Sequence, residues 1–134
     1  MYEDGDKASG ESQIPNSRKR IKQILLKPSD AKPLDEALDA IQAADAIILG
    51  PGSLYTSLIP NLLVKDITLA ISKSKAKKIY VVNVMTQPGE TDGYSASDHV
   101  KAVVNHSSPD VIDSVIINSS HIPDYLLSRY LLDG

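Results

Sequence analysis

Cysteine is absent from this sequence, which excludes disulfide bonds and thiolate metal sites and agrees with a cytoplasmic protein. No run of about 18 apolar residues occurs, so we expect no segment that spans a bilayer. Met1 leads directly into Tyr-Glu-Asp-Gly-Asp, which lacks the basic and apolar regions of a signal peptide. These absences together predict a cytoplasmic protein without a membrane span.

Familiar signatures of phosphate chemistry are also missing. The sequence has no Gly-x-x-x-x-Gly-Lys-Ser/Thr loop, and Gly50-Pro51-Gly52 lacks the spacing of a dinucleotide fingerprint. No nucleophile has an obvious base beside it. The net charge of −3, with both signs mixed, argues against nucleic acid as a partner. Basic residues cluster at 18–20 and 73–78, where a solvated face or a helix end is the simpler interpretation.

The 134 residues predict one α/β domain over residues 1–134. Residues 1–17 are polar, and Asp4-Gly5 is typical of a tight turn, so this segment is expected to form a hairpin or an edge segment. Residues 20–27 favour a strand that ends at Pro28, although the apolar spacing would also suit a helix.

The rest of the chain alternates strands with helices. Apolar runs predict strands at 45–50, 79–84 and 111–117. The strand at 45–50 is expected to be buried, and the strand at 79–84 is apolar on both faces, as in the interior of a parallel sheet. Helices are predicted at 33–44, 65–75, after Ser95 (with Asp98 completing a capping box), and from Pro123. In the last of these helices, Leu126, Leu127, Tyr130 and Leu131 would face inward. This order predicts consecutive parallel crossovers, hence a three-layer, Rossmann-like α/β fold with a mainly parallel sheet.

The most informative stretch follows the strand at 45–50. Two glycines flank a proline at Gly50-Pro51-Gly52, which frees the backbone for a sharp turn and leaves its amides uncovered. Four hydroxyls follow within five residues, and amides with hydroxyls at a strand end suit an anion such as phosphate. The alternative is an ordinary turn whose Ser and Thr residues cap a helix. These hydroxyls belong to Ser53, Tyr55, Thr56 and Ser57.

Three strands are expected to end at one edge of the sheet in small polar loops, 50–53, 83–93 and 118–120. Open α/β sheets bind ligands beyond the carboxyl ends of their strands, so we expect a binding site there. Glu90 could hold a ribose hydroxyl or a hydrated metal ion, or it could be an ordinary acid of a surface turn. His99 could donate to phosphate or act as an acid or base, or simply face solvent beside a helix-stabilising Asp98.

Two motifs resemble one known family. They are the stretch 50–57 (Gly-Pro-Gly-Ser-Leu-Tyr-Thr-Ser) and the stretch 83–91 (Asn-Val-Met-Thr-Gln-Pro-Gly-Glu-Thr), supported by Asp98-His99-Val100. The chain resembles the YvcK-type gluconeogenesis factors, which are related to the CofD 2-phospho-L-lactate transferases. The resemblance covers almost the whole chain.

The resemblance implies a cytoplasmic, Rossmann-like protein that binds a nucleotide or a nucleotide sugar, UDP-N-acetylglucosamine in the YvcK branch, and that supports gluconeogenic growth and cell shape. It implies no tightly bound cofactor, although the transferase branch uses a guanosine diphosphate carrier with magnesium. By resemblance and position together, the expected ligand-binding residues are Gly50, Pro51, Gly52, Ser53, Tyr55, Thr56, Ser57, Asn83, Thr86, Gln87, Gly89, Glu90, Thr91, Asp98, His99 and Tyr130.

The chain also departs from the family pattern. Family members open with a Gly-Gly-Gly-Thr-Gly loop and an Asp-Asp-Gly-Gly-Ser segment, and neither occurs here. We therefore expect an internal fragment that carries roughly the second half of the family fold. Three functions stay open: a non-catalytic nucleotide-sugar-binding regulator, which the missing nucleophile–base pair favours, a phospho-group transferase, and a scaffold piece. A homo-oligomer or an unidentified regulatory protein would be its macromolecular partner.

Overall fold

A computed structural model describes the backbone of residues 1–133 and the side chains of residues 1–130. The α-helices are α1 (Asp35–Ala43), α2 (Ile59–Leu62), α3 (Lys65–Lys73), α4 (Ala96–His106) and α5 (Asp124–Asp133). The strands are β1 (Ala46–Leu49), β2 (Lys77–Val81) and β3 (Ser114–Ile116). Short 3-10 turns lie at η1 (Glu11–Gln13), η2 (Pro15–Ser17) and η4 (Pro109–Val111), and a π-helical turn lies at η3 (Leu54–Leu58).

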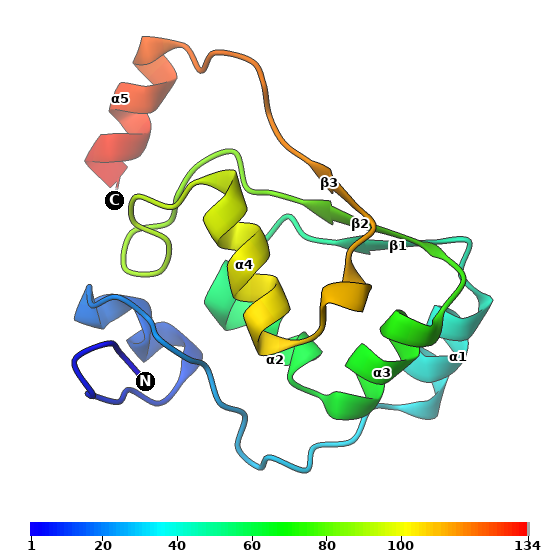
Figure 1. Ribbon diagram of the computed structural model, residues 1–134. Coiled ribbons are helices and arrows are strands. Elements are labelled where there is room, and N and C mark those ends of the chain that lie inside the picture. Colours follow the sequence, from blue (N-terminus) through cyan, green and yellow to red (C-terminus); the bar gives the residue numbers. More distant parts are fainter. Residues whose placement is uncertain (134) are drawn as a thin grey trace.

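The three strands form one parallel sheet in the order β1-β2-β3 (Figure 1). Ile48 pairs with Ile79, and Val81 pairs with Ile116, so side chains of neighbouring strands stand beside each other on the same face. Along the chain, α1 precedes β1, α2 and α3 lie between β1 and β2, and α4 lies between β2 and β3. The expected α/β class with a parallel sheet is confirmed.

One face of the sheet is covered. Leu49 of β1 and Tyr80 of β2 are buried there, together with Lys78, whose ammonium group lies 3.7 Å from an Asp113 carboxylate oxygen. Burial raises the pKa of Tyr80 to about 12. Helices α1 to α4 lie on this side of the strands (Figure 1). The core continues from this face into η3, α2, α3 and α4.

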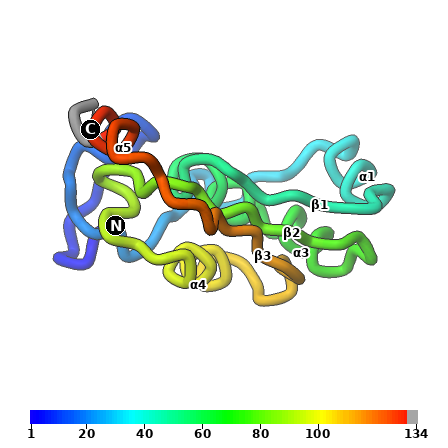
Figure 2. Tube along the Cα trace, turned by 90° about the horizontal axis from the view of Figure 1, so that it is seen from above, coloured from blue at the N-terminus to red at the C-terminus, as the bar shows by residue number. Residues whose placement is uncertain are grey.

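The other face of the sheet carries exposed apolar side chains. Ile48 is 64% exposed and Ile116 is 53% exposed. No helix crosses over the strands when this side is viewed (Figure 2). The described residues therefore build two of the three expected layers. The prediction that 45–50 is a fully buried strand was wrong, because an apolar run on a parallel strand indicates cover on both faces and only one is covered here.

The amino-terminal segment differs from its prediction. A tight turn at Asp4 and Gly5 is present, but η1 and η2 follow it in place of a hairpin. Residues 20–27 are not a strand, because their only sheet-like pairing is an isolated bridge from Ile21 to Tyr2. Ile21 and Ile24 are nevertheless buried, so the segment is an extended arm anchored in the core.

Helix α4 begins as its sequence predicts. Ser95 accepts the Asp98 amide at 3.3 Å, and the Ser95 amide donates to Asp98 Oδ2 at 3.1 Å, which is a capping box. Helix α5 departs from expectation, because Leu126, Leu127 and Tyr130 are all substantially exposed and none faces a core. Leu131, expected to face inward, lies outside the described side chains.

No single helix in the described part of the chain is long and apolar enough to cross a membrane, and only the bent pair Leu54–Leu62 and Lys65–Lys73 reaches that length and composition jointly.

Candidate functional site

The loop after β1 and the loop after β2 lie against each other at the carboxyl edge of the sheet. The Gly52 amide donates to Asn83 Oδ1 at 3.0 Å, and Asn83 Nδ2 donates back to the Gly52 carbonyl at 2.9 Å. These two hydrogen bonds hold the turn after β1 against the start of the loop after β2. The expectation that these two loops converge on one edge is therefore met.

Glycine is required at the first position of this turn. Gly50 has φ of 76°, a left-handed conformation that side chains disfavour. A Cβ atom there would lie 2.8 Å from the Val81 carbonyl oxygen. The close approach of β1 to β2 at the site thus depends on the missing side chain.

Glu90 is turned into the protein. Its side chain is buried at 4% exposure. One carboxylate oxygen accepts the Tyr55 amide at 3.1 Å, and the other accepts the Thr56 hydroxyl at 2.8 Å. A carboxylate at the first turn of η3 also complements the helix dipole. The contacts therefore give Glu90 a positioning role, which differs from the expected contact with a ribose or a metal ion.

The four hydroxyls of the turn do not point to one place. The Tyr55 hydroxyl lies 2.7 Å from the Tyr94 hydroxyl in the interior, and burial, followed by this hydrogen bond, raises the pKa of Tyr55. Thr56 donates to Glu90, as described. Ser53 is half-buried and Ser57 is exposed, so these two hydroxyls lie nearest the surface. Several donors of this turn are therefore already hydrogen-bonded to protein groups, whereas a phosphate-binding turn would leave them free for the ligand.

The loop after β2 is held rigidly by its own side chains. The Gln87 amide donates to the Thr91 hydroxyl at 2.7 Å, and Thr91 is fully buried. The Gly89 amide donates to Asp92 Oδ2 at 2.7 Å. Gly89 also packs against the Pro15 carbonyl so closely that a Cβ atom would overlap it. The η2 turn of the amino-terminal segment thus packs against this loop.

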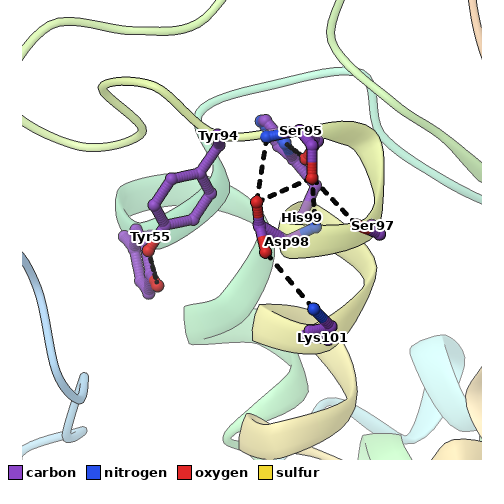
Figure 3. A network of polar contacts seen from close by, with 7 residues as sticks. All are labelled: Tyr55, Tyr94, Ser95, Ser97, Asp98, His99 and Lys101. Atoms are coloured by element: carbon purple, nitrogen blue, oxygen red, sulfur yellow. Dashed lines mark hydrogen bonds and ion pairs between the residues drawn. The ribbon is translucent and has the colours of Figure 1, made fainter.

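Asp98 and His99 lie at the start of α4 in a polar network (Figure 3). Hydrogen bonds from Ser95, assisted by Lys101, lower the pKa of Asp98. His99 is 2% exposed, its Nδ1 lies 2.9 Å from the Ser95 carbonyl oxygen, and its ring meets the Tyr94 ring edge-on at 5.5 Å. His99 Nε2 has no hydrogen-bond partner among the described residues. Asp98 therefore caps helix α4, and His99 packs against Tyr94 without reaching the surface.

Tyr130 reaches the site from α5. Its hydroxyl donates to the Thr86 carbonyl at 2.9 Å, although the ring was expected in a core. A cavity of about 390 Å³ opens between α5 and the loop after β2. It is lined by Val84, Met85, Ile122, Leu126, Arg129 and Tyr130. The cavity combines an apolar wall with one guanidinium group and one aromatic ring.

Two further features bound the site. The third strand exit, 118–120, forms its own turn through Asn118 and Ser120, and no hydrogen bond joins it to the other two loops within the described residues. A larger cavity of about 680 Å³ lies between α1 and α3, on the helices and away from these loops. No cluster of three or more His, Asp or Glu side chains suited to a metal occurs in residues 1–130.

Tyr94 and His106 contribute contacts around the site that were not predicted from the sequence. Tyr94 joins Tyr55 to His99, and it directly precedes the N-cap Ser95, a position where an apolar residue often packs on the helix. His106 accepts the Ile24 amide at 3.2 Å and so ties the amino-terminal arm to α4. No local pattern predicts that contact, because it joins residues 82 positions apart.

Comparisons with known proteins agree with one another. The family model described as 2-phospho-L-lactate transferase CofD matches residues 1–134. The gluconeogenesis factor of Halalkalibacterium halodurans is 51% identical over 128 residues, which are 96% of this chain and 40% of that protein. The gluconeogenesis factor of Bacillus subtilis is 51% identical over 132 residues, 98% of this chain and 42% of that protein.

A crystal structure of a UPF0052 family member from Bacillus halodurans matches with a TM-score of 0.95 at 50% identity, over 98% of this chain and 42% of that one. The chain thus spans about two fifths of the length of these relatives. The expectation that it is the second half of the family fold was wrong, since the matched part is less than half of each relative and is not its C-terminal half.

Proposed function

Since this chain belongs to the CofD family, in which its relatives are gluconeogenesis factors, we propose that it carries one wall of a binding site for a nucleotide or a nucleotide sugar of the UDP-N-acetylglucosamine type. A regulatory partner protein, or another subunit of a homo-oligomer, would recognise the ligand-bound conformation. The proposal includes a role in the cytoplasm, in the control of carbon metabolism and cell shape.

The observation that carries the proposal is the junction of the two loops. Asn83 clamps Gly52, and Glu90 clamps the first turn of η3, so both loops are held in one arrangement before any ligand arrives. Pre-organised polar loops at the carboxyl edge of a parallel sheet are typical of ligand sites. The exposed parts of this edge therefore form the proposed contact surface.

The cavity beside this junction supports an organic, anionic ligand. Tyr130 offers a ring face for a planar base, and Arg129 offers a guanidinium group that suits phosphate. On the other loop, Gly52 is exposed and Ser53 is half-buried, so both can offer polar surface to a ligand. Of the remaining predicted contacts, Pro51 and Ser57 are exposed, and Thr86 and Gln87 are half-buried.

Binding without catalysis fits the side chains better than transfer chemistry. Glu90, a candidate for holding a metal ion, and His99, the acid–base candidate, are both buried in contacts with the protein itself. The Asp98 carboxylate at the start of α4 is held by Ser95 and Lys101. The described carboxylates thus do not assemble a magnesium site for a CofD-like transfer from a guanosine carrier.

Calorimetry tests the proposal with UDP-N-acetylglucosamine, and separately with guanosine diphosphate plus magnesium. This chain and the full-length Bacillus subtilis gluconeogenesis factor are titrated side by side. We expect the nucleotide sugar to bind, and Tyr130→Ala or Arg129→Ala in this chain to weaken binding at least tenfold. Tyr125→Ala is the matched control, because Tyr125 is exposed on α5 and does not line the cavity.

Two results would reject the proposal. Equal binding by Tyr130→Ala and the unchanged chain would remove the cavity from the site. Binding of guanosine diphosphate with magnesium in preference to the nucleotide sugar would favour the transferase alternative.

A further inference from the structure

The cavity of about 680 Å³ between α1 and α3 has no part in the proposed nucleotide site. The two helices lie side by side, and each ends where the chain enters the amino end of a strand, β1 after α1 and β2 after α3 (Figure 1). Sites for small molecules in proteins have volumes of about 300–1,000 Å³, so this hollow has the size of a ligand site. We call it the α1–α3 cavity.

Aliphatic side chains form most of the wall of the α1–α3 cavity. Leu38 comes from α1, Leu69 and Ala70 come from α3, and Ala44 and Ala76 come from the segments that follow these helices. Leu69 is 51% exposed, so an apolar chain in the cavity would remove leucine surface from water. None of the described residues that line the cavity is aromatic, so a planar base has no ring on which to stack. The wall therefore suits an aliphatic group.

Positive charge gathers at one end of the cavity. Lys73 in the last turn of α3 and Lys75 just beyond that helix both line it, and both are exposed. Neither ammonium group has a carboxylate within ion-pair distance in the described part of the chain, whereas Lys78 of the same basic cluster pairs with Asp113. Asp66 also lines the cavity, but its carboxylate lies 3.1 Å from the Lys32 ammonium group. The two lysines are thus available to an anion.

The basic end of the cavity is held in shape by Ser74. Its hydroxyl donates to the Ile41 carbonyl of α1 at 3.3 Å and accepts the Ala76 amide at 3.1 Å, so it joins the ends of the two helices. A site that is already organised loses less entropy when a ligand binds. Because α1 and α3 both end here, their partial negative charges favour a singly charged anion over a phosphate dianion.

We propose that the α1–α3 cavity binds an aliphatic monocarboxylate. The carboxylate group lies by the ammonium groups of Lys73 and Lys75, and the hydrocarbon chain lies along Leu38, Leu69 and Ala70. The inference does not depend on the proposed nucleotide site, because no described residue that lines this cavity belongs to the loops after β1 and β2.

Titration of this chain with octanoate, followed by the amide chemical shifts in NMR spectra, tests the proposal. Octanoate is kept below its micelle concentration, in a buffer of low ionic strength. We expect saturable shifts confined to residues 38–44 and 66–76. Octanol supplies the chain without the charge and acetate supplies the charge without the chain, so each should bind at least tenfold more weakly. Added salt should weaken octanoate binding, because it screens the attraction between the charges.

Substitutions separate the charged end from the apolar wall. Lys75→Gln should weaken octanoate binding about threefold, and the double variant with Lys73→Gln about tenfold. Lys65→Gln is the matched control, since Lys65 is exposed on α3 but does not line the cavity. Ala70→Leu should abolish binding by filling the cavity, and it keeps a good helix former in α3, so the spectrum of the free variant should remain that of a folded chain.

Four results would overturn the proposal. They are shifts that lie mainly outside α1 and α3 or never saturate, octanol binding as tightly as octanoate, octyl phosphate binding more tightly than octanoate, and octanoate binding that survives Ala70→Leu. Saturating UDP-N-acetylglucosamine should leave the octanoate shifts in place. Displacement of octanoate would assign it to the nucleotide site and would equally overturn the proposal, whereas failure of the nucleotide sugar to bind would reject only the proposed function.

Discussion

Replacing Glu90 by alanine tests how the two loops of the site are joined. The substitution removes a buried carboxylate that accepts the Tyr55 amide and the Thr56 hydroxyl, at 3.1 and 2.8 Å. A hydrogen bond to a charged group contributes about 1.5–3 kcal/mol to stability, and a buried donor left without a partner adds to the loss. We therefore expect Glu90→Ala to lower the free energy of unfolding by about 3–5 kcal/mol.

Glu90→Gln separates charge from shape. The amide oxygen can still accept the Tyr55 amide, and the amide nitrogen can donate to the Thr56 hydroxyl, so we expect a loss of about 1 kcal/mol. Urea unfolding of both variants gives the two free energies, provided that the dependence on urea concentration keeps its slope.

Thr56→Val completes a double-mutant cycle with Glu90→Ala. Because the two side chains share one hydrogen bond, removing the hydroxyl should cost about 1 kcal/mol less once the carboxylate is gone. Two results would refute the role of Glu90 in holding the first turn of η3. One is a coupling energy near zero, and the other is a free energy of unfolding of Glu90→Ala within about 1 kcal/mol of the unchanged chain.

Three further predictions concern single positions. Gly50→Ala should destabilise the chain by about 2 kcal/mol or more in urea unfolding, because it combines a strained left-handed backbone with overlap of a β2 carbonyl oxygen. His106→Phe should cost about 1–2 kcal/mol, since the Ile24 amide loses its acceptor, and amide hydrogen exchange at Ile24 should accelerate. Asp98 has a pKa lowered below 3.8, so its contribution is present above that value and is lost as the pH falls through the lowered pKa. Asp98→Asn should thus lower the melting temperature at pH 7, with a difference that vanishes in strong acid, and a pH-independent difference would contradict the capping role.

The elements could be predicted where one local rule governs them. The capping box depends only on Ser95 and Asp98, three positions apart in the sequence, and the structure contains it. The parallel sheet follows from alternating strands and helices, because a crossover needs a helix between parallel strands. The junction at Gly52 and Asn83 follows as well, since carboxyl ends of parallel strands meet at one edge.

Predictions failed where burial depends on distant chain segments. An apolar strand such as Ala46–Leu49 indicates two covered faces, but the sequence does not state which segment covers each. Residues 20–27 have strand-like composition, yet they pair only at Ile21, because no neighbouring strand lies alongside. The prediction that one face of α5 is buried was wrong for the same reason. The helix has apolar residues at helical spacing, but few described residues pack against them.

The inward turn of Glu90 changes where an anion can bind at this edge. The Gly50–Ser57 stretch has the composition of an anion-binding turn, and it does hold an anion, namely the carboxylate of Glu90 on the Tyr55 amide and the Thr56 hydroxyl. A ligand phosphate placed on the same donors would meet a buried like charge, which is strongly unfavourable in a poorly solvated site. The donors for a ligand therefore have to come from the outer rim, beyond Ser53, and from Arg129 across the cavity. If the proposed function holds, the Glu90 carboxylate thus organises the loops, and the ligand phosphate is expected toward α5.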